Sequence, residues 1–118
     1  MRIFDVDSIA PAEQKSLTDQ LLAGEAIQQA FRAASTTILF TDRRILTMQL
    51  HVLLTERLET SSFSYRSIRQ FSMLQGASSE GRSEVKVWLG ADAQPLHLRA
   101  NEGTDLAGLH RLLAEMLP

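Results

Sequence analysis

The chain has 118 residues, of which 44% are hydrophobic and 22% charged, and its formal net charge at pH 7 is −2. These proportions are typical of a soluble globular domain, and the charge gives no bulk attraction to nucleic acid or to anionic lipid. Because the chain has no cysteine, disulfides, thiolate metal sites and cysteine nucleophiles are excluded.

The N-terminal segment does not resemble a secretory signal. Asp5 and Asp7 interrupt any apolar run within residues 1–11. No window of the sequence approaches the roughly 18 apolar residues of a membrane span. We therefore expect a cytoplasmic protein in which residues 1–118 fold as a single domain.

A short helix is predicted over residues 11–23. Pro11 suits the first turn of a helix, because its missing backbone donor is harmless there. Leu17 and Leu21 then share one face. Gly24 follows at the position where a left-handed residue commonly ends a helix.

Seven antiparallel strands are predicted within a meander covering residues 25–99. They are enriched in Ile, Phe, Thr and Leu, and they span residues 25–32, 36–41, 44–50, 56–63, 68–74, 84–89 and 95–99. The clearest turn is at Asp42 and Arg43, where a polar pair separates two apolar, β-prone runs. This pattern predicts a tight hairpin.

The strand over residues 84–89 alternates most regularly between apolar and polar side chains. Its core face is predicted to carry Val85 and Val87, with Trp88 on the opposite face. The loop before this strand, Gln75 to Ser83, is rich in glycine and serine. Such a composition indicates a mobile or ligand-facing loop.

A second helix is predicted over residues 104–117. Its apolar stripe comprises Leu106, Leu109, Leu113, Met116 and Leu117. Asp105 lies near the positive end of the helix dipole, and Asn101 or Thr104 is expected to cap the first turn. So wide an apolar stripe must be buried, and the open end of the sheet is the surface available for it.

Landmarks of a known family occur in order along the sequence. They are Leu21, Leu22, Gly24 and Glu25; Phe40, Thr41, Asp42, Arg44 and Ile45; Tyr65, Arg66, Ser67, Ile68 and Phe71; and Ser83, Glu84, Val85, Lys86 and Trp88, followed by the terminal leucine-rich helix. This ordered set resembles the bacterial pleckstrin-homology (PH) family over essentially all of the chain after Pro11.

The resemblance implies a mainly β fold with α elements. In this fold a seven-stranded, bent antiparallel sheet or partly open barrel is capped by a C-terminal helix, here with a short N-terminal helix. It also implies a domain without enzymatic activity that assembles into homo-oligomers, often ring-like, rather than one with a proven lipid ligand.

The segment over residues 49–54 departs from the family pattern, because it is apolar and has no glycine. Leu50, Val52, Leu53 and Leu54 either form an exposed run that marks an interface or belong to an extended, buried strand. Trp88 either packs under the N-terminal helix or anchors a subunit contact. These five residues are the candidate interface.

A lipid or small anionic ligand is the alternative partner. The loop Arg32 to Thr36 carries a single arginine, which is too few donors for a multiply charged headgroup. Tyr65, Arg66 and Arg69 form the candidate ligand or partner surface. The alternative for these three residues is a local turn in which Ser67 makes hydrogen bonds and the arginines remain in water.

No residue set predicts catalysis, a metal or a cofactor. His51, His97 and His110 lie in separate elements without a ligand partner at i, i+4, and each is expected near the surface. We therefore predict a non-catalytic PH-like scaffold whose first partner is itself and whose second is another protein. The mechanism is pairing of strand edges and apolar faces, with neither nucleic acid nor membrane lipid expected as a partner.

Overall fold

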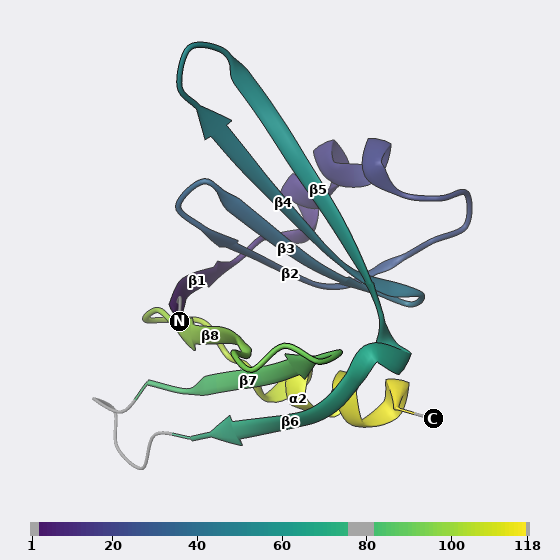
Figure 1. Ribbon diagram of the computed structural model, residues 1–118, viewed down its shortest axis with the longest axis vertical. Helices are drawn as coiled ribbons and strands as arrows, with labels where there is room; N and C mark the ends of the chain where they lie inside the picture. The colour runs from purple at the N-terminus through teal and green to yellow at the C-terminus, as the bar shows by residue number, and fades with distance from the viewer. Residues whose placement is uncertain (1–2, 76–81, 118) are drawn as a thin grey trace. The chain divides into compact units, whose positions relative to one another are not determined.

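The computed structural model describes residues 3–75 and 82–117 (Figure 1). The chain forms two compact units. The first, residues 8–64, is called the hairpin unit. The second comprises the described residues of segments 1–7 and 65–118 and is called the helix unit.

Four antiparallel strands form the hairpin unit, and each pairs with the next along the chain. They are β2 (Ile27–Ala33), β3 (Thr36–Thr41), β4 (Arg44–Val52) and β5 (Glu56–Ser64). The predicted turn at Asp42 and Arg43 is confirmed, because Phe40 on β3 pairs with Ile45 on β4 across it.

Two short helical elements precede these strands. The first is α1 (Pro11–Gln14), with proline in its first turn as predicted, and it continues as the 3-10 helix η1 (Lys15–Gln20). The predicted helix over residues 11–23 is therefore too long. Gly24 has the expected positive φ of 80°, but it lies in a turn where the Glu25 N–H donates to the Leu22 carbonyl at 3.0 Å.

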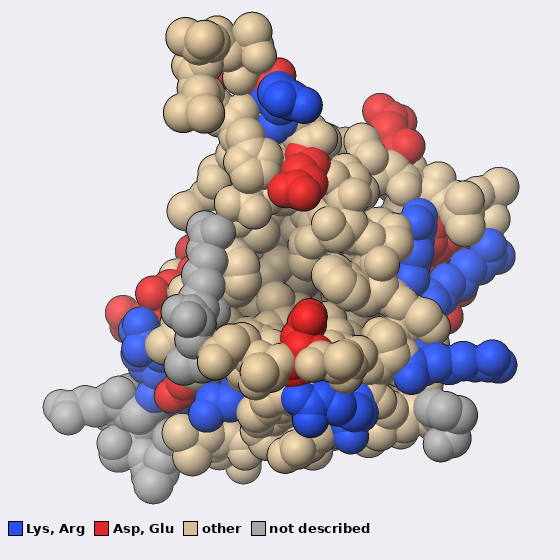
Figure 2. Space-filling model, in the orientation of Figure 1, with Lys and Arg blue, Asp and Glu red and all other residues tan. Residues whose placement is uncertain are grey.

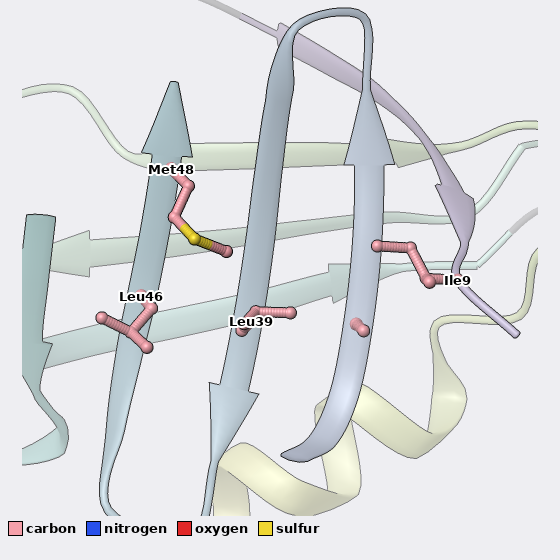
Figure 3. Close-up of a cluster of buried hydrophobic side chains, with 5 residues drawn as sticks. Ile9, Leu39, Leu46 and Met48 are labelled. Atoms are coloured by element: carbon pink, nitrogen blue, oxygen red, sulfur yellow. The ribbon is translucent and has the colours of Figure 1, made fainter. Parts of the chain in front are cut away.

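A cluster of buried side chains covers one face of this sheet (Figure 3). Its members are Ile9, Ala30, Leu39, Leu46 and Met48, with Leu17, Leu21 and Ile27 packed against it. Leu39 and Leu46 are direct cross-strand partners on β3 and β4. The N-terminal helical segment thus buries its apolar face against the strands that follow it.

The helix unit holds four further strands in the order β1-β8-β7-β6. Their bounds, with those of the two helical elements, are β1 (Ile3–Ser8), the 3-10 helix η2 (Tyr65–Ser67), β6 (Ile68–Leu74), β7 (Glu84–Leu89), β8 (Leu96–Ala100) and α2 (Ala107–Met116). Val85 and Val87 are fully buried, which confirms the predicted core face of β7.

Strand β1 is absent from the predicted meander. It runs parallel to β8, with Ile3 opposite His97 and Val6 opposite Ala100. The described residues therefore contain eight strands rather than the seven predicted, because this N-terminal strand is added to the seven.

The predicted buried face of the C-terminal helix is confirmed for Leu106, Leu109 and Leu113, which are inaccessible to solvent, but not for Leu117, which is exposed beyond the end of the helix. Its predicted cap is wrong, because the residue at the N-cap position is Leu106, which makes no side-chain capping hydrogen bond, and the helix begins at Ala107. Asp105 lies near the first turn as expected, and its Oδ1 accepts a hydrogen bond from the Ala107 N–H at 2.9 Å.

Within residues 3–75 and 82–117, no helix combines the length and apolar character needed to cross a membrane.

Candidate interaction surface

The β4–β5 hairpin extends past the neighbouring strand of its own sheet. Pairing between β3 and β4 ends at Thr36 and Gln49, whereas pairing between β4 and β5 continues to Val52 and Glu56. The turn over residues 53–55 therefore lies beyond the end of β3, as Figure 1 shows for the hairpin unit.

The end of this hairpin is apolar and exposed. Leu53 and Leu54 expose 93% and 101% of their reference areas, Val52 exposes 61% and Leu58 53%. In Figure 2 the corresponding end of the molecule is tan, with charged side chains beneath it. The alternative of an extended, buried strand is right about the strand, because β4 reaches Val52. It is wrong about the burial, because Val52 is exposed.

The exposed stripe continues the buried cluster of the hairpin unit. Because side chains alternate along a strand, Leu50 and Val52 share the face of Met48, and Leu58 lies on that face directly opposite Leu50. A groove beside η1 is lined by the apolar residues Leu17, Ala34, Met48, Leu50 and Leu58, together with the polar residues Ser16, Gln20, Ser35 and Thr37. On this face the buried side chain of Met48 is thus followed directly by the exposed side chains of Leu50, Val52 and Leu58.

The opposite face of the same hairpin is polar. His51 and Glu59 lie within hydrogen-bond distance, with 2.9 Å between Nε2 and Oε1. Arg57, opposite His51 in the register, shares this face. One face of the hairpin end is therefore mainly apolar, with Glu56 opposite Val52 as its charged residue, and the other face is polar.

Strand β5 is an edge strand of the sheet. Among the described residues, β4 lies on one side of it and no strand lies on the other. Charged residues occupy its first half at Glu56, Arg57 and Glu59, and the remainder, Thr60–Ser64, is uncharged. An exposed edge of this kind can accept a strand from another chain.

Trp88, the remaining candidate interface residue, is half-buried on β7. It lies on the face of Glu84 and Lys86, opposite Gln70 of β6. It belongs to the helix unit, whereas the exposed leucines belong to the hairpin unit.

The predicted ligand surface at residues 65–69 is not a cluster of available groups. Tyr65 is 5% exposed, so its predicted surface position is wrong. Arg69 donates from Nη2 to the Asp92 carbonyl at 2.6 Å, and Arg66 is exposed on η2. Of the neighbouring loop proposed to face a ligand, residues 76–81 lie outside the described residues.

A buried ion pair holds the base of the β3–β4 hairpin. Glu25 accepts hydrogen bonds from Thr41 Oγ1 at 2.6 Å, from the Leu22 N–H at 2.9 Å, and from Nε and Nη2 of Arg44 at 3.0 Å each. The Arg44 guanidinium, aided by Thr41 and the backbone, lowers the pKa of Glu25 from 4.5 to about 2. This network stabilises the fold and is too fully paired to bind a ligand.

Asp5 joins β1 to two arginines of the helix unit. Its Oδ1 accepts from Arg99 Nε at 2.7 Å and from Arg82 Nη2 at 2.8 Å. The hydrogen bond from Arg99 is the main cause that lowers the pKa of Asp5. Arg82 also donates to the Ala100 carbonyl at 2.9 Å. These arginines are therefore engaged within the protein.

The three histidines lie on three different elements: His51 on β4, His97 on β8 and His110 on α2. His97 is 3% exposed, so its predicted surface position is wrong. Its Nε2 contacts Glu84 Oε1 at 2.5 Å, and its buried Nδ1 has no hydrogen-bond partner among the described residues. The His110 ring packs edge-on against Phe71 at 5.3 Å. In the described part of the chain, no group of three or more histidine or acidic residues is placed to hold a metal ion.

A mainly antiparallel sheet followed by a C-terminal helix, with a short helical segment near the N-terminus, defines a PH-like fold. The sequence matches the family model described as the bacterial PH domain over residues 3–117. The chain therefore belongs to the bacterial PH-domain family, and the resemblance inferred from its residues is confirmed.

Similar proteins are found among both sequences and solved structures. The protein YjqA of Bacillus subtilis strain 168 is 28% identical over 104 residues, which cover 87% of this chain and 83% of YjqA. A DUF1696-family protein with a PH domain from Shewanella loihica PV-4 has a TM-score of 0.77 at 19% identity, covering 96% of this chain and 97% of that one. A PH domain from Shewanella amazonensis SB2B has a TM-score of 0.67 at 21% identity, covering 90% and 96%.

Proposed function

We propose that this chain is a non-catalytic, cytoplasmic PH-like domain that acts through protein–protein association, first with further copies of itself. The observation that carries the proposal is the exposed apolar end of the β4–β5 hairpin beside the edge strand β5. Two features needed for association, apolar area and an accessible strand edge, occur on one element.

The apolar side chains at this end are large enough to drive association. Fully burying one leucine or valine contributes roughly 1.5–3 kcal/mol. Val52, Leu53 and Leu54 are all more than half exposed, so most of that free energy is still available in the single chain. A second copy that covers them offsets part of the entropic cost of association.

A lipid or small anionic ligand has weaker support. The charged residues beside the apolar end are Glu56, Arg57 and Glu59, which sum to a net negative charge and do not attract an anionic surface. Arg69 of the predicted ligand surface is held by the Asp92 carbonyl. We therefore place protein association ahead of lipid binding.

The test is the absolute mass in solution, measured by light scattering after gel filtration over a range of protein concentrations and at low and high salt. We expect a multiple of 13.2 kDa that persists at high salt, because apolar contacts are not screened. The variant Leu53→Ser/Leu54→Ser should lower the mass. Leu22→Ser is the matched control, since Leu22 is 56% exposed and lies away from the hairpin end in the sequence.

A monomer at every concentration would overturn the proposal. In that case flotation with vesicles containing anionic phospholipid would decide whether the alternative replaces it. Vesicle binding that is lost in Leu53→Ser/Leu54→Ser would assign the apolar end to a membrane surface.

A further inference from the structure

The outer side of β5 is complementary to itself. We propose that β5 of one copy pairs antiparallel with β5 of a second copy, in a register centred on Leu58. This inference rests on the proposed function, because it names the edge and the register through which the chain associates with itself.

The direction of the backbone groups supports this register. The Leu50 N–H donates to the Ser35 carbonyl at 3.0 Å, so the Leu50 backbone points toward β3 and away from β5. Leu58 is opposite Leu50, and in an antiparallel ladder the pair that does not exchange hydrogen bonds points its groups outward. The N–H and C=O groups of Leu58, and by alternation those of Glu56 and Thr60, therefore point to the outer side.

A two-fold pairing centred on Leu58 also places opposite charges next to each other. Arg57 then lies opposite Glu59 of the second copy, and the symmetry makes this pair twice. Because residues 57 and 59 direct their backbone groups toward β4, they form non-hydrogen-bonded pairs across the new contact, where facing side chains approach most closely. Opposite charges at such positions stabilise a strand pair.

The same register aligns the leucines. Leu50 is opposite Leu58 within one copy, and Leu58 lies opposite Leu58 of the second copy. A row of leucines thus crosses from β4 through both β5 strands to the second β4, on the face that continues the buried cluster. Cross-strand apolar pairs of this kind contribute to sheet stability.

Neighbouring registers lose these features. Pairings centred on Arg57 or Glu59 place like charges directly opposite each other. A pairing centred on Thr60 places Arg57 opposite Phe63 and Glu59 opposite Ser61, which removes the charge pairs.

Single cysteines test the register directly, because the natural chain has none. In the proposed pairing, residues at position 58 are about 5.5 Å apart between Cα atoms, within disulfide range. Residues at position 60 are offset by roughly 13 Å along the strands, which is too far. Mild oxidation should therefore cross-link Leu58→Cys into a covalent dimer much faster than Thr60→Cys, its matched control on the same face.

Charge exchange gives an independent measurement. Arg57→Glu and Glu59→Arg should each weaken self-association, because each places like charges across the pair. Mixed in equal amounts, the two variants should form a heterodimer more readily than either forms a homodimer. The register centred on Thr60 predicts no such preference.

The outcomes separate this inference from the proposed function. Preferential cross-linking of Thr60→Cys would overturn the register centred on Leu58. Cross-linking of neither variant while the natural chain is oligomeric would overturn the β5 pairing altogether, and both results would leave self-association intact. A natural chain that is monomeric throughout and is cross-linked by neither cysteine would overturn both.

Discussion

Glu25 and Arg44 form a bidentate ion pair, in which Nε and Nη2 of the arginine each donate to a carboxylate oxygen at 3.0 Å. The Glu25 side chain is inaccessible to solvent, and that of Arg44 is 23% exposed. The pair joins the turn before β2 to the first residue of β4, so it ties two distant segments of the hairpin unit together.

Glu25→Gln should destabilise the protein at neutral pH. The fall in the pKa of Glu25 from 4.5 to about 2 corresponds to roughly 3 kcal/mol, of which screening at the partly exposed arginine leaves about 2. Because the folded-state pKa is depressed, this stability is present above pH 4.5 and is lost as the pH falls toward 2.

Urea unfolding of natural protein and Glu25→Gln at a series of pH values checks this prediction. The difference between their free energies of unfolding should shrink as the pH falls from 4.5 to 2. Glu13→Gln is the control, since the Glu13–Arg32 pair is exposed on both sides at 3.5 Å and should contribute less than about 0.5 kcal/mol. A pH-independent difference would show that Glu25 acts without its charge.

Ala34→Gly should stabilise the β2–β3 hairpin. Ala34 has a φ of 50°, the only positive value among the described non-glycine residues, and a two-residue turn with positive φ at its first position favours glycine there. Relief of the Cβ strain is expected to add about 1 kcal/mol in thermal or urea unfolding. Ser35→Gly, at the next position of the turn, should give no such gain; equal effects of both changes would contradict the argument from φ.

Local patterns predicted the elements that depend on local order. The Asp42–Arg43 turn and the alternation of Val85 and Val87 are properties of adjacent residues, and the structure confirms both. Strand β1 escaped prediction because Asp5 and Asp7 interrupt its apolar pattern. Its position depends instead on pairing with β8, which is distant in the sequence.

The candidate interaction surface could be predicted only where it depends on adjacent residues, and not where it depends on pairing between distant strands. The apolar run ending at Leu54 is visible in the sequence, but its exposure depends on β3 being shorter than β4 and β5. The burial of His97 was missed because β8 lies between β7 and the unpredicted β1. The arginines beside Tyr65 predict an exposed turn, yet Tyr65 is buried, because its ring has enough apolar area to favour burial.

Leu109→Ala should be strongly destabilising. Leu109 is fully buried on α2, and removing a buried leucine side chain costs the transfer free energy and leaves a cavity, typically 2–5 kcal/mol together. Leu117→Ala, 37% exposed just beyond α2, should cost less than about 1 kcal/mol. Thermal unfolding followed by circular dichroism measures both, and a small loss in Leu109→Ala would show that α2 is not packed as described.

Asp5→Asn should loosen β1 without unfolding the rest of the helix unit. The Asp5 carboxylate bonds Arg99 of β8 and Arg82 at once, so replacing it with an amide removes the charge that both arginines face. We expect faster amide hydrogen exchange along β1 and little change in β7, with the difference from the natural protein reduced at high salt because the pairs are exposed. Asp7→Asn is the control, since the described structure gives Asp7 no ion pair with an arginine. Unchanged exchange in β1 would mean that its backbone pairing with β8 suffices, with the register from Ile3 to Val6 held by the ladder alone.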